Sequence, residues 1–240
     1  MRSPFEQFEI VRVGWLSNSG AIMLIGIGVI LMLMRILIIG GGRMVPSRYG
    51  VLVEGIYKMI GEMVKENIGK AGERYRGIMM VIFMSILVLN MIGMVPYSYT
   101  VMAQIVVTLT ISIGVWIGKL IIGYKKHGIR ILGIFIPEGV PFGMVPVFVI
   151  IEIVGFIIPM ISLAVRLFAN MLSGHVLLKV LFSFMWSMFL SGGVMVIVHM
   201  IPLGVIMLLI GLEVCVGIIQ AYVFTLLTCI YVGDMERGGH

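Results

Sequence analysis

Two almost wholly apolar segments, residues 141–184 and 191–232, constrain the fold of this chain more than any other feature. An α-helix rises about 1.5 Å per residue, so a helix of 40 residues extends roughly 60 Å, twice the hydrocarbon thickness of a bilayer. Each segment must therefore either cross a membrane twice or form one long helix inclined far from the membrane normal. Pro146, Pro159 and Pro202 allow kinks but do not decide between these alternatives.

The composition indicates an integral membrane protein. Of the 240 residues, 60% are hydrophobic and only 12% are charged, whereas about 25% are charged in a typical soluble domain. Three further apolar segments, residues 20–39, 77–95 and 100–122, are each long enough to span a bilayer as a helix. We therefore predict an all-α membrane protein, a single membrane domain over residues 1–240 with about five transmembrane helices.

The segment between the first two spans, residues 40–76, is polar and basic, with seven Lys or Arg residues against four Glu. Within it, residues 51–66 carry apolar side chains at helical spacing. This pattern predicts an amphipathic helix that lies in the membrane interface rather than crossing it. Residues 1–19 lack the apolar centre of a signal peptide and are predicted to form a surface N-terminus.

A second basic loop is predicted to hold Lys119, Lys125, Lys126 and Arg130. Basic loops stay on the inner side of a membrane, and the Arg237 tail is expected on the same side. Two crossings in only one of the long apolar segments would leave that tail on the wrong side. The charge pattern therefore favours one long helix in each segment, with the N-terminus outside.

The sequence supports no soluble-enzyme site. The net charge of +6 comes from basic residues between the apolar segments, where they contact anionic lipid rather than nucleic acid. Cys215 and Cys229 would lie about 21 Å apart on one helix, too far for a disulfide. No phosphate-binding loop, nucleophile constellation or clustered set of metal ligands stands out. We therefore expect no cofactor, no metal and no nucleic-acid partner.

Arg166 lies in the middle of the first long segment, with Asn170 one turn later. At about 100° per residue the two side chains lie roughly 40° apart on one face, whereas His175 points to the opposite side. A guanidinium at membrane depth costs about 2.5–3.5 kcal/mol by insertion scales and keeps its proton at ordinary pH. Arg166 must therefore face a polar cavity or an acidic partner. The apolar residues on both sides disfavour the alternative, a helix-end arginine that reaches the headgroups.

Four more ionisable residues fall at membrane depth: Glu152, His175, His199 and Glu213. Glu152 is predicted to share the face of Arg166 about 21 Å away along the axis, and Glu213 is aligned with Gln220. Carboxylates and imidazoles inside a membrane are candidates for a proton path. Other interpretations stay open: Glu213 protonated and simply buried, Gln220 in helix packing, and His199 at the interface.

These residues carry a resemblance to a known family. Two segments are similar to subunit a of the F-type ATP synthase, the stator subunit beside the rotating ring of c subunits: S-L-A-V-R-L-F-A-N-M-L-S-G-H-V-L-L-K-V (162–180) and G-L-E-V-C-V-G-I-I-Q-A-Y-V-F-T-L-L-T (211–228). Shorter matches are S-P-F-E-Q-F-E-I (3–10), N-M-I-G-M-V-P-Y-S-Y (90–99) and P-E-G-V-P (137–141). The resemblance covers nearly the whole chain except residues 184–203.

The resemblance implies that Arg166 is the family's essential arginine, facing the carboxylate of each passing c subunit. Asn170, Gln220 and Tyr222 match polar positions beside it.

The resemblance also implies two half-channels. His175 and Glu213 match the pair that lines the inlet half-channel, in the arrangement of mitochondrial and some bacterial members. Glu152 and Asp234 match acidic positions near the outlet half-channel.

As a member of this family the chain would be a non-catalytic, proton-translocating subunit of the F0 part of the complex. Its last two helices would form a long, strongly inclined hairpin against the c-ring. The implied partners are the c-ring, the peripheral stalk and other F0 subunits, with membrane lipid, cardiolipin among the candidates, and no small-molecule substrate other than H+. The implied location is the mitochondrial inner membrane, or else a bacterial plasma membrane.

Two other classes of function remain as alternatives. An autonomous ion channel or secondary transporter would conduct by itself and would usually show an internal repeat of hydropathy, which this sequence lacks. A purely structural membrane scaffold would not need ionisable groups aligned at membrane depth.

Overall fold

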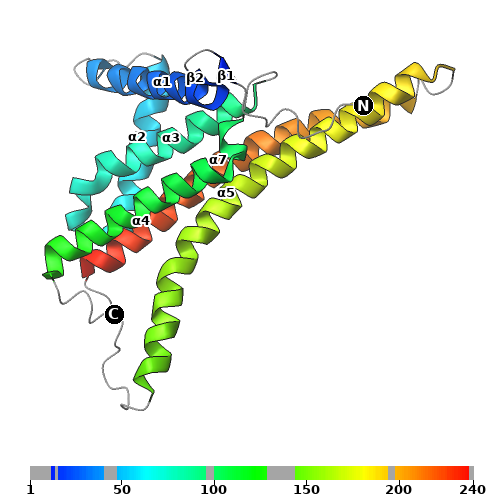
Figure 1. Ribbon diagram of the computed structural model, residues 1–240. Coiled ribbons are helices and arrows are strands. Elements are labelled where there is room, and N and C mark those ends of the chain that lie inside the picture. The colour runs from blue at the N-terminus through cyan, green and yellow to red at the C-terminus, as the bar shows by residue number, and fades with distance from the viewer. Residues whose placement is uncertain are drawn as a thin grey trace.

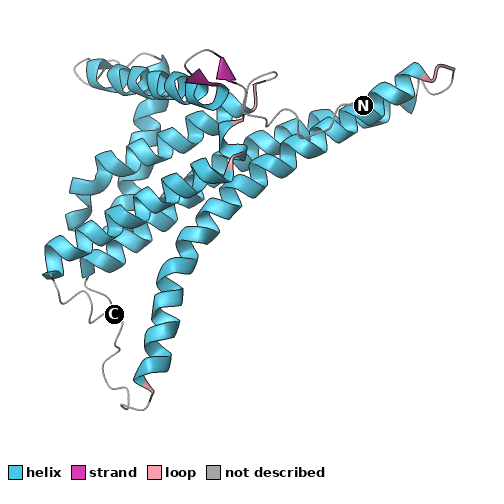
Figure 2. Cartoon of the chain, in the orientation of Figure 1, coloured by secondary structure: helices cyan, strands magenta, loops and turns pink. Residues whose placement is uncertain are grey.

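The computed structural model describes residues 12–13, 16–40, 48–95, 100–128, 144–193 and 198–237, and these are almost entirely helical (Figures 1 and 2). The α-helices are α1 (Asn18–Gly40), α2 (Arg48–Ile68), α3 (Arg76–Gly93), α4 (Ile105–His127), α5 (Val145–Leu190) and α7 (Met200–Arg237). The 3-10 turns η2 (Lys70–Tyr75) and η3 (Val101–Ala103) precede α3 and α4. Strands β1 (Arg12–Val13) and β2 (Leu16–Ser17) pair antiparallel before α1. The predicted segments 3–10 and 137–141 and the loop residue Arg130 lie outside the described residues.

The prediction of an all-α membrane protein is confirmed. Among the described residues, four helical stretches are long and apolar enough to cross a membrane: Gly72–Gly93, Ile105–His127, Val149–Leu190 and Met200–Arg237. The first predicted span falls on α1, which contributes a shorter apolar stretch, Ser19–Leu33. The chain is thus a multi-pass membrane protein.

The described part of each long apolar segment contains one long helix, α5 in the first and α7 in the second. Helix α5 contains 46 residues and α7 contains 38, so α5 alone is roughly 70 Å long at 1.5 Å per residue. Figure 1 shows α5 curving along its length, and Pro159, which cannot donate a helical hydrogen bond, lies inside it. Both helices exceed the hydrocarbon thickness of a bilayer, so neither can cross it upright without projecting far beyond it.

Helix α4 corrects the prediction of a second basic loop that includes Lys119. The helix continues to His127, and Gly128 ends it with a φ of 58°. Lys119 therefore lies inside a transmembrane helix, and it is only 6% exposed. Lys125 and Lys126 occupy the last turn, where cations interact favourably with the negative end of the helix dipole.

Helix α2 covers the predicted amphipathic segment, and its apolar face packs on protein. Val53, Ile60 and Val64 are buried, and α2 contacts both α3 and α7. At the far end, Gly233 of α7 allows the backbone of α2 to approach closely, because a Cβ there would lie 2.7 Å from the Asn67 carbonyl oxygen. The apolar face of α2 is thereby covered by neighbouring helices.

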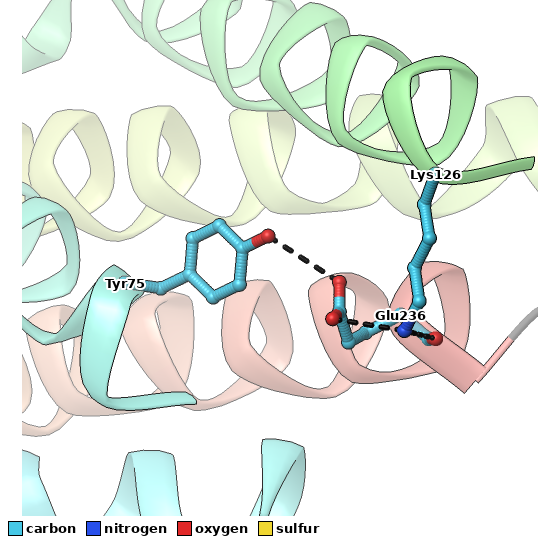
Figure 3. Close-up of polar contacts among 3 residues, drawn as sticks. All are labelled: Tyr75, Lys126 and Glu236. Carbon is cyan, nitrogen blue, oxygen red and sulfur yellow. Dashed lines mark hydrogen bonds and ion pairs between the residues drawn. The ribbon is translucent and has the colours of Figure 1, made fainter. Parts of the chain in front are cut away.

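Helix α7 is the centre of the packing, because it contacts α2, α3, α4 and α5. The largest fully buried side chains include Phe224 of α7, Ile60 of α2, Met79 of α3 and Leu167 of α5. The C-terminal end of α7 is held by Glu236, whose carboxylate accepts hydrogen bonds from Tyr75 Oη at 3.3 Å and Lys126 Nζ at 2.9 Å (Figure 3). These contacts join the start of α3, the end of α4 and the end of α7 at one end of the bundle.

Candidate functional site

Polar side chains from α5 and α7 meet in a pocket between these two helices. On α7, Glu213, Gly217 and Gln220 recur at intervals of four and three residues, so they lie on one face of the helix, and all three are buried. This face packs against α5. The pocket has a volume of about 190 Å³, and its polar lining comes from Asn170, Ser173, Glu213 and Gln220.

His175 and Glu213 approach each other across the helix interface. Nε2 of His175 lies 3.6 Å from Oε1 of Glu213. Both atoms are buried, and neither forms a hydrogen bond with another described residue. A small side-chain movement would bring them within hydrogen-bonding distance, about 2.6–3.2 Å. The two residues are therefore arranged so that a proton could pass between them.

Gly174 makes this approach possible. A Cβ at residue 174 would lie 2.6 Å from Oε1 and 3.0 Å from Cδ of Glu213. Any larger residue would have to displace the carboxyl group. The glycine beside His175 therefore determines where the Glu213 carboxyl group can lie.

Amides continue the polar surface from the His175–Glu213 pair. Asn170 Nδ2 donates a hydrogen bond to Oε1 of Gln220 at 3.2 Å, and Asn90 Nδ2 on α3 donates one to the Gly217 carbonyl at 3.0 Å. The remaining polar atoms, Oδ1 of Asn90 and Nε2 of Gln220, are buried without a hydrogen-bond partner among the described residues. Leaving such buried groups unpaired is costly, so a water molecule that bonded to them would be stabilising.

Arg166 lies on the outer side of α5. Its neighbours Leu163, Ala164 and Leu167 are buried, whereas Arg166 itself is exposed. It forms no ion pair with any described carboxylate, although it is close enough to Tyr231 on α7 for electrostatic interaction. The charged side chain therefore faces outward, and Asn170, one turn later, turns toward α7.

The remaining predicted site residues lie apart from the pocket. Tyr222 is exposed, and Glu152 is half-buried on the first part of α5. Asp234 is exposed near the end of α7 and lies within electrostatic range of Lys119 and Tyr231. The structure thus brings together His175, Glu213, Asn170 and Gln220, but not all of the predicted residues. His199 precedes α7, and its ring packs edge-on against Phe189 at 5.4 Å.

The site predicted from the sequence did not include two buried polar residues, Lys119 and Asn90. The Lys119 ammonium lies 3.6 Å from the centre of the Phe156 ring and 5.2 Å from that of Tyr231, and attraction to aromatic faces offsets part of its desolvation. On α4 it follows Thr108 and Ser112, both buried, at spacings that place all three on one helix face. That polar stripe was the available signal for a buried lysine.

Comparison with known proteins adds independent information. The family described as "ATP synthase A chain" matches residues 21–233. A protein named ATP synthase subunit a from Chondrus crispus is 39% identical over 241 residues, which cover 97% of this chain and 95% of the relative. Proteins with the same name from Marchantia polymorpha and Afipia carboxidovorans are 38% identical over 97% of both chains and 36% identical over the full length of both.

Proposed function

Because the chain belongs to the family of F-type ATP synthase subunit a, we propose that it is the proton-translocating subunit of the F0 part of an ATP synthase. It would itself catalyse no bond-making step. Its task would be to let protons cross the membrane only by way of a rotating ring of c subunits. A proton that moves through the membrane field carries about 2.3 kcal/mol per 100 mV, and rotation would use this energy.

The exposure of Arg166 is the observation that carries the proposal. A permanently charged side chain at membrane depth requires an opposite charge or a polar cavity, and no described carboxylate of this chain pairs with it. Ser162, Ala169 and Ser173 are exposed on the same face of α5, and small residues allow another helix to approach closely. Both features suit a c subunit whose carboxylate passes in front of Arg166.

The pocket between α5 and α7 suits the inlet half-channel. Water would find polar partners there, because Oε1 of Glu213 and Nε2 of Gln220, both from residues that line the pocket, are buried without a hydrogen-bond partner among the described residues. His175 and Glu213 would pass protons inward to the carboxylate of the ring. The protonated, neutral carboxyl group can then turn into lipid at small cost.

Glu152 and Asp234 are proposed for the outlet half-channel. After nearly a full turn the carboxyl group would meet this second path and release its proton. Arg166 would stand between the two paths, where its charge repels protons and lowers the pKa of a nearby carboxylate. This arrangement would prevent a direct leak between the inlet and the outlet.

The proposed partners are the c-ring, the peripheral stalk and other F0 subunits, together with membrane lipid. We propose the mitochondrial inner membrane as the location, with a bacterial plasma membrane as the alternative. Fractionation of cells into organelle and plasma membranes distinguishes the two locations.

The test of the proposal is proton-driven ATP synthesis in vesicles that contain the complex with Arg166→Ala. We expect synthesis to fall to background while the complex still assembles, because the variant removes the only proposed barrier between the paths. Lys179→Ala, which removes another cation of α5, serves as the matched control and should leave synthesis near the wild-type rate. Synthesis by Arg166→Ala at the control rate would contradict the proposal.

A further inference from the structure

A second cavity lies between α3 and α4, is also lined by residues of α7, and is separate from the pocket between α5 and α7. Its volume is about 920 Å³, within the range of roughly 300–1,000 Å³ that is usual for ligand pockets. Its apolar walls are formed by side chains that recur at helical spacing on α3 and α4: Ile78, Ile82, Ile86, Ile111 and Ile122. We call this cavity the α3–α4 groove.

Two glycines deepen the α3–α4 groove. Gly114 and Gly118 of α4 line it, and a Cβ at either position would meet no atom within 4 Å. They lie one turn apart, so the missing side chains leave a continuous apolar channel along α4. An apolar chain could therefore lie lengthwise between the two helices.

One end of the groove is basic. Arg74, Lys125 and Lys126 line it there, and Lys119 lies deeper, whereas Glu236 is the only carboxylate among the described residues that line it. Lys126 is already paired with Glu236 (Figure 3). Arg74 and Lys125 are both exposed and form no ion pair with the described part of the chain. The groove therefore has an uncompensated positive end.

This basic end lies where a headgroup would be. Arg74 precedes α3, Lys125 is in the last turn of α4, and Tyr75 is beside them, so the charges lie at the ends of two predicted membrane spans. Tyrosine and basic side chains are enriched at this depth of a membrane. Basic pockets between transmembrane helices on the inner side bind the headgroups of anionic lipids.

We infer that the α3–α4 groove binds an anionic phospholipid. Its phosphate would contact Arg74 and Lys125, and an acyl chain would extend past Gly118 and Gly114 between the isoleucines. The lipid would fill the space between α3 and α4 and support the packing of both helices on α7. This inference requires only that the chain spans a membrane, and it does not depend on the proposed role of Arg166.

The test uses the intact complex, reconstituted in phosphatidylcholine vesicles with a trace of photoactivatable phosphatidylglycerol. Crosslinked peptides are identified by mass spectrometry and compared with those from a photoactivatable phosphatidylcholine with identical acyl chains. We expect the anionic probe to label the groove-lining peptides of α3 and α4 preferentially. The double variant Arg74→Gln/Lys125→Gln should reduce that labelling about 25-fold, at about fivefold per basic residue.

Two matched controls separate this site from general attraction to a basic surface. Lys58→Gln/Lys65→Gln removes two exposed cations of α2 and should leave the labelling unchanged. Gly118→Leu keeps all the charges but fills the channel and should abolish the labelling, whereas Gly55→Leu on α2, where a Cβ also meets no atom within 4 Å, should not.

Equal labelling by the two probes, or full labelling of the Arg74→Gln/Lys125→Gln complex, would overturn the inference. So would the finding that another subunit occupies the groove and excludes both probes. If the variants fail to assemble, the wild-type complex still decides. Excess unlabelled phosphatidylglycerol must displace the probe and excess phosphatidylcholine must not, and failure of this competition would also refute the lipid site.

Discussion

Gly174→Ala tests the His175–Glu213 pair without removing either residue. The added Cβ would lie 2.6 Å from Oε1 of Glu213, well inside van der Waals contact, so the carboxyl group must move. Because that atom is the end of a flexible side chain, the fold should survive and the complex should assemble. The His175–Glu213 separation, now 3.6 Å, should no longer close to hydrogen-bonding distance at low cost.

The expected size of the effect follows from the cost of overpacking, about 1–3 kcal/mol. Each 1.36 kcal/mol changes a rate tenfold, so this cost would slow proton entry by about 5- to 150-fold. The measurement is passive proton flux through the reconstituted F0 part, followed with a pH-sensitive dye, together with proton-driven ATP synthesis. Gly155→Ala on the same helix, where a Cβ meets no atom within 4 Å, is the control. Flux through Gly174→Ala equal to that of the control would refute the proposed role of the pair.

Three further predictions concern the site and its support. Glu213→Gln should slow proton entry by about 100-fold or more, as expected for the loss of a proton-transfer group. Unchanged proton flux in vesicles would show that Glu213 has only a packing role. Asn90→Ala should destabilise the chain by about 1–3 kcal/mol, because it removes the bond to the Gly217 carbonyl; an unaltered thermal midpoint of the solubilised complex would show that this bond is unimportant. Ile60→Ala should lower the free energy of unfolding by about 2–5 kcal/mol and make α2 more sensitive to protease. Leu52→Ala, at a position 68% exposed, should have little effect. Equal protease sensitivity of the two variants would contradict the packing of α2 on α7.

The long helices illustrate what the sequence could and could not predict. Hydropathy alone allowed residues 141–184 to form one helix or two, because both arrangements bury the same apolar side chains. Basic loops are expected on the inner side of the membrane, and this expectation favoured one helix. In the structure, α5 is a single helix. The partner of the amphipathic segment 51–66 was not predictable, because the apolar face of a helix looks the same whether lipid or α7 covers it.

The sequence could predict which site residues share a face of one helix, but not which residues meet between two helices. Periodicity aligned Glu213 with Gln220 and separated His175 from Arg166 by half a turn. The contacts between helices, such as Gly174 against Glu213 and Asn170 with Gln220, depend on how α5 and α7 are aligned lengthwise, which no local pattern determines. Lys119 was misassigned because Lys125 and Lys126 follow closely. Its aromatic neighbours Phe156 and Tyr231 come from distant parts of the chain.

The central claim is that Arg166 faces a carboxylate of a neighbouring c subunit, and a density map of the intact complex tests it most directly. The account predicts that the outer face of α5 with Ser162, Ala169 and Ser173 lies against the ring. The Arg166 guanidinium should then be the cation nearest to a c-subunit carboxylate. A map in which Arg166 points into lipid, or pairs with an acidic residue of its own chain away from any ring, would contradict the account.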